Sequence, residues 1–189
     1  MCLDIRLNTA EDGYIVYGMG RYTGSNIIIP DTYNGLPVTE IASYAFQGKN
    51  ISSVVIGNNI KVIGSYAFNN CSYLKAITWG EKVERIQNSA FSYSAITGLS
   101  LPDSVKGIGS QAFCYCRSLT SVSVGNGVQS IADNAFSWCF DLRNFSYRGT
   151  KEEWGKVIVT SWFAQETGFS YIYCSDGSIA FSDPGDGAD

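Results

Sequence analysis

Apolar residues recur along this chain in a fixed order and at a nearly fixed interval. The dipeptide Ala-Phe recurs at steps of 22 or 23 residues through five successive units, and the phenylalanines of these units are Phe46, Phe68, Phe91, Phe113 and Phe136. An isoleucine stands four residues before each of these alanines, and a valine or isoleucine stands three residues before that isoleucine. Self-similarity at this interval is typical of a repeat protein, in which each unit buries its apolar face only against neighbouring units.

A second pattern follows each phenylalanine, as in Leu119-x-x-Val122-x-Val124, with Leu or Ile at its first position. The alternation at its end predicts a short strand. Units of 22 residues lose one residue between the phenylalanine and this strand, where a turn absorbs the loss without changing the strand register. Each unit is therefore expected to add one strand to a parallel sheet and one inward phenylalanine to a shared core.

These patterns together predict the fold class. We expect an α/β repeat solenoid that is right-handed and curved, with a parallel sheet of short strands on its concave face. Irregular or short helical arcs should form the convex face, and hairpin and helix caps should close the two ends. The five phenylalanines should stack as the structural spine of the core, because parallel neighbours lie about 4.8 Å apart.

The motif V-x-x-I-x-x-x-A-F followed by C-x-x-L-x-x-I resembles the BspA-like, or Treponema-type, leucine-rich repeats of bacterial surface proteins. Ordinary leucine-rich repeats carry an asparagine three residues after the last leucine of the strand, and this chain has Lys82 at that point in its second unit. That departure is itself typical of the BspA-like class. The resemblance covers Ile27 to Tyr147 and implies a leucine-rich-repeat fold in a secreted or cell-surface protein of bacteria.

Both ends of the chain depart from the repeat, and the open edges of a solenoid need caps. Alternating residues on both sides of the turn Asp12-Gly13 predict an N-terminal hairpin cap in residues 1–26. Residues 27–148 are expected to form the solenoid, with a degenerate first unit and five units of 22–23 residues.

The C-terminal region, residues 149–181, is expected to form a second cap. Thr150 and Glu153 fit a capping box, and Trp154, Val157 and Ile158 have the spacing of an amphipathic helix. Alternation into the turn Asp176-Gly177 then predicts a final hairpin. The G-T-x-x-x-W and C-x-D-G runs here also resemble the cap of BspA-like proteins. Residues 182–189 are acidic and glycine-rich, which predicts a disordered tail.

Three cysteines, Cys71, Cys116 and Cys139, share one phase of the repeat and are expected to stack in the core as small buried thiols. A disulfide between Cys116 and Cys139 is the alternative, because neighbouring units allow the required separation. Cys114 has a phase that polar residues fill in other units, so we expect it to be exposed. The chain offers no second cysteine pair with zinc-ligand spacing, so no metal site is predicted.

The composition of the chain argues against several classes of function. The net charge is −4, 16% of the residues are charged, and no Lys/Arg-rich run is present, which argues against binding to nucleic acid. No apolar stretch approaches the roughly 20 residues that span a bilayer, so membrane insertion is not expected. Histidine is absent, which removes imidazole bases, Ser-His and Cys-His pairs and His-ligated metals. The sequence therefore predicts a protein that is not an enzyme and needs no cofactor.

The residues between the inward positions of the predicted strands should face the concave surface. This surface is small, hydroxyl-rich and almost uncharged, and it is one candidate binding face. Its residues are Ser53, Val55, Thr78, Ser100, Ser121, Ser123, Asn144, Ser146 and Arg148. The alternative is that Ser and Thr are present only because they tolerate close neighbours in a tight sheet.

A second candidate surface lies two residues after the last three repeated phenylalanines, where Tyr93, Tyr115 and Trp138 form an aromatic stripe. Exposed rings would offer contact area to a protein or to the apolar faces of sugars. Partial burial against the arc, with the rings as filler, is the alternative.

The function predicted from these features is a non-catalytic binding module for protein–protein interaction or adhesion. Its expected partner is a host protein or another cell-surface protein. The alternative function is carbohydrate recognition by the aromatic stripe. The chain starts with Met1-Cys2-Leu3-Asp4 and shows no signal peptide, so a trimmed leader and a cytoplasmic protein both stay open.

Overall fold

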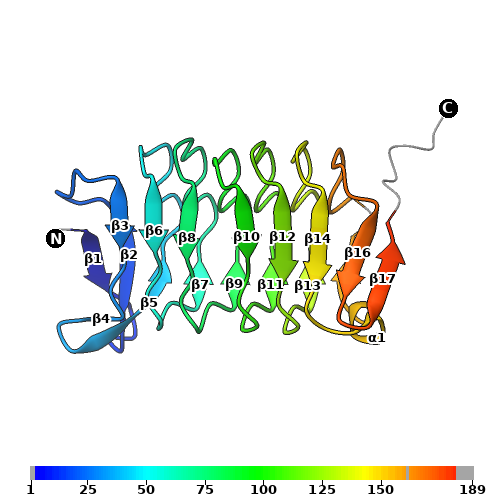
Figure 1. Cartoon of the computed structure of the whole chain (residues 1–189). Helices are drawn as coiled ribbons and strands as arrows, with labels where there is room; N and C mark the ends of the chain where they lie inside the picture. The colour runs from blue at the N-terminus through cyan, green and yellow to red at the C-terminus, as the bar shows by residue number, and fades with distance from the viewer. Residues whose placement is uncertain (1–2, 161, 182–189) are drawn as a thin grey trace.

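A computed structural model describes residues 3–160 and 162–181 of the chain. The chain winds into coils that stack in a single row from the N-terminal to the C-terminal end (Figure 1). Coils in the repeats contribute one short strand to each of two sides, so the molecule is a solenoid, as predicted.

The predicted strands after each phenylalanine form two sheets on one side, which we call the leucine-side sheets and in which every strand pair but the last is parallel. One contains β3 (Asn26–Ile28), β6 (Ser53–Val55) and β8 (Ala76–Thr78). The other contains β10 (Gly98–Ser100), β12 (Ser121–Val124), β14 (Asn144–Tyr147), β16 (Tyr171–Cys174) and β17 (Gly177–Ala180). Equivalent repeat positions are in register, since Val122 pairs with both Leu99 and Phe145.

The opposite side carries a nine-stranded sheet, which we call the valine-side sheet because five of its strands end at the isoleucine of the V-x-x-I motif. Its strands are β1 (Asp4–Leu7), β2 (Tyr14–Gly18), β4 (Thr32–Tyr33), β5 (Leu36–Ile41), β7 (Val62–Ile63), β9 (Arg85–Ile86), β11 (Gly107–Ile108), β13 (Ser130–Ile131) and β15 (Ile158–Val159). The isoleucines of β9, β11 and β13 pair in parallel, Ile86 with Ile108 and Ile108 with Ile131. This sheet was not predicted.

The prediction of helical arcs is wrong, because every second amide in the arcs donates to a carbonyl of the neighbouring coil. The amide of Phe68 donates to the Ala90 carbonyl at 2.7 Å, and the amide of Phe91 donates to the Ala112 carbonyl at 2.8 Å. A helix would need those amides for bonds within its own segment. Among the described residues the only helix is the single turn α1 (Lys151–Trp154).

The expected amphipathic helix at the C-terminal end is also wrong in its extent. The capping box forms, with the Glu153 amide donating to the Thr150 hydroxyl and the Thr150 amide donating to the Glu153 carboxylate. However, α1 ends at Trp154, and Ile158 lies in β15, opposite Ser130 of β13. The β-branched Ile158 and Val159 extend the valine-side sheet, which gives them a paired, extended backbone.

Antiparallel hairpins lie at both ends of the stack, β1 with β2 and β16 with β17. The second hairpin turns between Cys174 and Gly177, which are paired. The predicted disordered tail, residues 182–189, lies outside the described residues.

The core of the solenoid is a continuous ladder of aromatic rings. Phe46, Phe68, Phe91, Phe113 and Phe136 are all 0% exposed. Successive ring centroids lie 5.0, 5.1, 5.4 and 5.4 Å apart, with interplanar angles of 11° or less. Phe145 closes the ladder with an edge contact to Phe136 at 5.5 Å. The spacing of the strands thus sets the spacing of the rings.

Candidate functional site

The leucine-side face holds a shallow hollow over β10, β12 and β14. Its volume is about 450 Å³, and the residues that line it are Ile77, Trp79, Gly98, Leu99, Ser100, Ser121, Val122, Ser123, Asn144 and Ser146. Two rows of small side chains cross it, Gly98–Ser121–Asn144 and Ser100–Ser123–Ser146, because parallel pairing places equivalent positions side by side. The other candidates from the sequence, Ser53, Val55 and Thr78, lie on β6 and β8 of the neighbouring sheet.

Hydrogen bonds inside the face use only part of its polar groups. The Ser53 hydroxyl donates to Asn26 Oδ1 at 2.9 Å, and the Ser146 hydroxyl donates to the Val122 carbonyl at 3.2 Å. Within the described part of the chain, the side chains of Ser121 and Asn144 have no hydrogen-bond partner. These two groups line the hollow and can therefore bond to a partner without breaking an existing contact.

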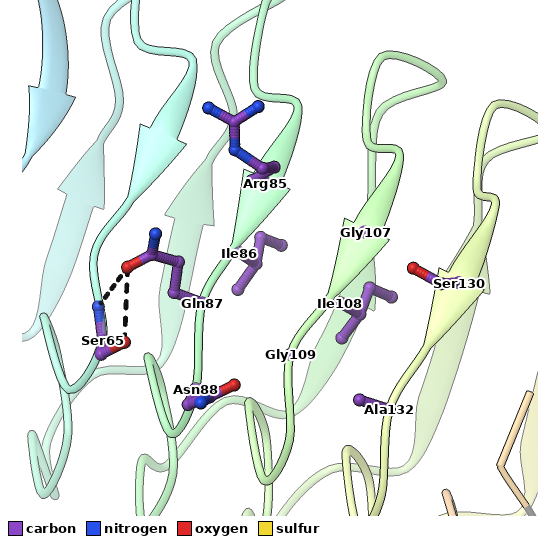
Figure 2. A pocket seen from close by; sticks show the side chains of 10 residues that line it. All are labelled: Ser65, Arg85, Ile86, Gln87, Asn88, Gly107, Ile108, Gly109, Ser130 and Ala132. Atoms are coloured by element: carbon purple, nitrogen blue, oxygen red, sulfur yellow. Dashed lines mark hydrogen bonds between the residues drawn. The ribbon is translucent and has the colours of Figure 1, made fainter.

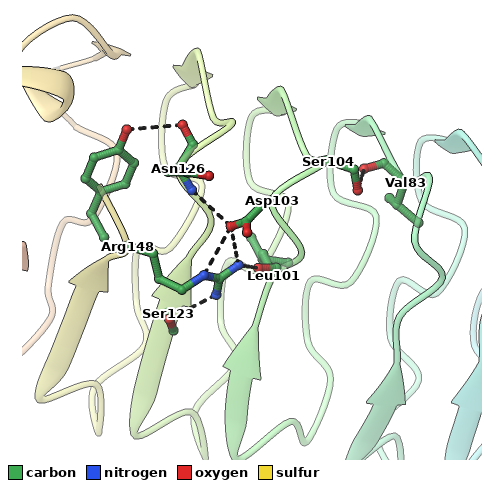
Figure 3. Close-up of polar contacts among 8 residues, drawn as sticks. Val83, Leu101, Asp103, Ser104, Ser123, Asn126 and Arg148 are labelled. Carbon is green, nitrogen blue, oxygen red and sulfur yellow. Dashed lines mark hydrogen bonds and ion pairs between the residues drawn. The ribbon is translucent and has the colours of Figure 1, made fainter. Parts of the chain in front are cut away.

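Arg148, the charged member of the predicted face, is held by the protein itself (Figure 3). Its Nη2 donates to Asp103 Oδ1 at 2.7 Å and to the Leu101 carbonyl at 2.6 Å, and its Nη1 donates to the Ser123 hydroxyl at 3.3 Å. The guanidinium lowers the pKa of the Asp103 carboxyl. Arg148 thus ties the end of β14 to the turn after β10, so it stabilises the face that it borders.

Trp79 lines this hollow and was missed by the sequence analysis, which placed it inward as the last residue of a strand. It is half-buried, and its ring contacts Phe91 edge-on at 5.6 Å. A tryptophan is larger than the Ile, Leu, Val or Tyr found at this phase in other units. That excess size was the available signal that part of the ring reaches the surface.

The predicted aromatic stripe is a stack of parallel rings. Tyr93 and Tyr115 have centroids 4.7 Å apart, and Tyr115 and Trp138 have centroids 5.6 Å apart. Tyr93 is 50% exposed, whereas Tyr115 and Trp138 are half-buried. All three residues have a left-handed backbone, with φ of 61°, 59° and 63°. Gly48 and Asn70 fill this phase in the first two repeats, and both adopt that conformation more readily than an aromatic residue does.

Two further residues extend the stripe and were not predicted. The Arg117 guanidinium carbon lies 5.8 Å from the Tyr115 ring centroid and 5.7 Å from that of Phe140. Phe140 in turn contacts Trp138 edge-on at 6.1 Å. Both residues follow a buried cysteine of the repeat directly, a position that varies among units and so gave no signal by itself.

The valine-side face holds another hollow, of about 440 Å³, between β9 and β13 (Figure 2). Gly107 on β11, and Gly109 just after it, carry no side chains there, so a trough opens beside Arg85 and Gln87. Gln87 Oε1 accepts hydrogen bonds from the Ser65 amide and hydroxyl, which leaves the Gln87 amide nitrogen as a free donor. The sequence analysis missed this trough because it predicted no sheet on this side.

The cysteines differ in part from expectation. Cys71, Cys116 and Cys139 are buried and unbridged, and their thiols donate to carbonyl oxygens of Phe46, Phe91 and Phe113 at 3.1, 3.4 and 3.2 Å. Cys114 was expected to be exposed and is 3% exposed, so that prediction is wrong.

The arcs explain the burial of Cys114. From the third repeat onward they pack closely enough to bury this phase, as Ser92 and Ser137 also show, whereas Gln47 in the first repeat is exposed. Burial raises the pKa of the Cys114 thiol to about 11. The described residues contain no cluster of three metal-ligating side chains.

Stacked coils of 22–23 residues, an internal phenylalanine ladder and parallel sheets define a solenoid of the leucine-rich-repeat class. The chain belongs to a particular family within that class, described as the BspA type leucine rich repeat region. That family matches residues 39–166 in six copies. The resemblance inferred from the repeat motif is thereby confirmed.

Solved structures agree with this assignment. A T. pallidum leucine rich repeat protein is 28% identical, and the match covers 75% of this chain and 78% of that protein with a TM-score of 0.61. A leucine rich cell surface protein from Faecalibacterium prausnitzii is 23% identical, and the match covers 82% of this chain and 40% of that protein with a TM-score of 0.71. The pneumococcal vaccine antigen PcpA is 22% identical, and the match covers 93% of this chain and 51% of that protein with a TM-score of 0.66.

The last two similarities are similarities of fold alone, and this chain spans about half of the length of those proteins or less. A comparison with curated proteins gave no match. Among residues 3–160 and 162–181, no helix is long and apolar enough to cross a membrane.

Proposed function

We propose that this protein is a non-catalytic binding module whose leucine-side face binds a protein partner. The observation that supports this proposal is the hollow over β10, β12 and β14, where five of the predicted face residues line one surface. The lining of the hollow includes the side chains of Ser121 and Asn144, which have no hydrogen-bond partner among the described residues. A partner can therefore gain hydrogen bonds without displacing internal ones.

Rigidity of the face favours binding. The strands β12 and β14 are each paired on both sides, so their backbone is fixed before a partner arrives. Association then avoids the entropy loss of ordering a loop. Arg148 strengthens this effect by fixing the border of the hollow through Asp103 and Ser123.

The proposed setting is the surface of a bacterial cell or the medium around it. The family assignment supports this setting, as does the fold that the chain shares with a protein described as a leucine rich cell surface protein. Adhesion to a host protein or to another cell is the role that we propose for the whole chain, with residues 1–26 and 149–181 acting as caps of the 27–148 solenoid.

The test uses a matched pair of substitutions on the two faces. Ser121 lies next to Gly98 and Ser130 lies next to Gly107, and in each case the serine hydroxyl is 3.5 Å from the place where a glycine Cβ would stand. Ser121→Arg therefore fills the leucine-side hollow, and Ser130→Arg fills the valine-side trough, with similar local disturbance. The wild-type chain is first measured by surface plasmon resonance against a panel of purified extracellular-matrix and cell-surface proteins.

For a protein that binds, we expect at least a tenfold loss of affinity from Ser121→Arg and less than a twofold change from Ser130→Arg. The reverse result would move the interface to the valine-side trough and overturn the proposal. Loss from neither substitution, or no binding to any protein on the panel, would also contradict it.

A second candidate function is carbohydrate recognition by the aromatic stripe. It is supported by the exposure of Tyr93 at the open end of the ring stack, since a free aromatic face can pack against the apolar face of a sugar. A glycan array with the wild-type chain and Trp138→Ala tests it. The proposal predicts binding that is lost in the variant, and an array without binding would contradict it.

A further inference from the structure

A third hollow opens beside the aromatic stripe, and a missing residue in the repeat accounts for it. Ile96, the first position of the apolar pattern that leads into the strand, follows Phe91 after five positions, whereas the equivalent Leu119 follows Phe113 after six. The shortened arc carries the small Ala95 and lies between two longer arcs. The hollow has a volume of about 310 Å³ and is lined by Asn70, Ser72, Tyr93, Ser94, Ala95, Tyr115, Arg117 and Ser118. We call it the notch.

The back of the notch is aromatic. Tyr93 begins the ring stack, and Asn70 precedes it at the same phase, so no ring covers the side of Tyr93 that faces the second repeat. Tyr44 and Tyr66 provide an internal comparison, because they also stack, at 5.0 Å, and also have positive φ. That pair lines none of the three hollows described above. The feature particular to Tyr93 is therefore its place beside an open, polar hollow.

One wall of the notch carries an unpaired cation. Arg117 has no carboxylate partner within ion-pair distance among the described residues, although its guanidinium lies over the rings of Tyr115 and Phe140. A guanidinium packed on aromatic faces keeps its N–H groups directed outward in its own plane. Arg117 is thus positioned to donate two parallel hydrogen bonds to a carboxylate.

The remaining lining groups are short and polar. The Ser94 hydroxyl donates to the Phe91 carbonyl at 2.6 Å and also lies 3.3 Å from the Cys116 sulfur, while the side chains of Asn70, Ser72 and Ser118 have no partner in the described part of the chain. Amide and hydroxyl groups of this kind suit a ligand that carries several hydroxyls. The notch therefore combines an aromatic platform, a cation and short hydrogen-bonding groups around a space of one sugar ring.

We propose that the notch binds a pyranose that carries a carboxylate, such as a uronic or sialic acid residue of an acidic glycan. The ring packs on Tyr93, and the carboxylate pairs with Arg117. This inference rests on the carbohydrate-recognition function proposed above and does not depend on protein binding by the leucine-side face. It names the ligand class and moves the centre of the site from Trp138 to the Tyr93 end of the stripe.

The test is a titration of the full chain, followed by saturation-transfer NMR and calorimetry. The probes are an oligogalacturonate and its methyl ester, sialyllactose and lactose, and a poly-glutamate peptide. We expect one of the two acidic probes to bind at least tenfold more tightly than its neutral counterpart, which is the methyl ester for the oligogalacturonate and lactose for sialyllactose. The acidic probe that binds identifies the class of acidic sugar. Binding should weaken as salt rises, since one ion pair is involved.

Three variants locate the site. Tyr93→Asn reproduces the residue found at Asn70, keeps the left-handed backbone accessible and should abolish binding. Arg117→Gln should remove most of the preference for the acidic sugar. Tyr44→Asn is the matched control, because it removes another exposed, stacked tyrosine with positive φ, and it should leave binding within twofold.

The possible negative results separate the acidic-sugar inference from the carbohydrate-recognition function. Equal binding of acidic and neutral sugars, or no effect of Arg117→Gln, would overturn this inference while carbohydrate recognition stands. Competition by poly-glutamate at equal carboxylate concentration would assign the notch to an acidic peptide and also overturn it. Absence of binding to any sugar would overturn both the inference and the carbohydrate function, and the Ser121→Arg comparison would still decide the protein-binding function.

Discussion

Two aromatic ladders run along this solenoid with the same spacing and different surroundings. The inner ladder of phenylalanines is fully buried, with centroids 5.0–5.4 Å apart, whereas the outer ladder of Tyr93, Tyr115 and Trp138 is partly exposed, with centroids 4.7 and 5.6 Å apart. The repeat imposes both spacings. The comparison shows that stacking alone does not reveal what a ring contributes, because burial decides whether it stabilises the fold or stays available to a ligand.

The largest expected effect is on the inner ladder. Phe91→Ala removes a ring that contacts Phe68 and Phe113 and leaves a cavity that the stacked backbone cannot close. We expect the free energy of unfolding to fall by about 3–5 kcal/mol. Chemical denaturation measures it, and a loss below about 1 kcal/mol would contradict the role of this ladder as the core.

Tyr93→Asn provides the contrast in the same coil. It removes one stacked pair, worth about 0.5–1.5 kcal/mol, but asparagine accepts the left-handed backbone more easily than tyrosine. We therefore expect a change in the free energy of unfolding of about 1 kcal/mol or less. A loss as large as that of Phe91→Ala would show that the outer ladder belongs to the core.

The ion pair at the border of the leucine-side face has a smaller effect. Because Arg148 and Asp103 are partly exposed, we expect Arg148→Met to cost about 1 kcal/mol or less at neutral pH. The lowered pKa of Asp103 means that its contribution is present above its unfolded pKa of about 4 and is lost as the pH falls through the folded value. The difference between the thermal melts of the two proteins should therefore shrink as the pH is lowered towards 2, leaving only the contribution of the Arg148 bonds to Leu101 and Ser123, and a constant difference would contradict this assignment.

The smallest effect is on reactivity and not on stability. The buried Cys114 thiol, with its pKa raised to about 11, should react with a thiol reagent in the native protein far more slowly than the half-exposed Cys174. Mass spectrometry of partly labelled protein distinguishes the two. Unfolding without reductant should release all six thiols, and fewer would indicate a bridge such as Cys116–Cys139.

The sequence predicted the solenoid and its family because the repeat is carried by large apolar residues at fixed positions. It failed at the V-x-x-I segments, which form the two-residue strands of the valine-side sheet, such as β9 and β11. Strands this short leave no room for the alternation that identifies a strand. Their extended structure comes from pairing with the next coil, which a single unit does not show.

Two other errors have the same origin. Cys114 was judged from the polarity of the residues at its phase, but its burial results from the packing of arcs against one another. Ile158 was assigned to a helix from its spacing to Trp154, but the open edge of β13 pairs with it. For the candidate sites, the sequence named Ser121, Asn144 and Tyr93, while the notch around Arg117 depends on how three successive arcs pack side by side.

The hydrogen bonds between arcs also govern how this molecule responds to pulling. Bonds such as those from Phe68 to Ala90 and from Phe91 to Ala112 join one coil to the next, and the two ends of the described chain lie at opposite ends of the stack (Figure 1). Force applied through those ends loads the outermost layer of bonds first. A tethered molecule should therefore peel open coil by coil and lengthen in steps of 22–23 residues, absorbing strain gradually while the remaining layers keep their surfaces.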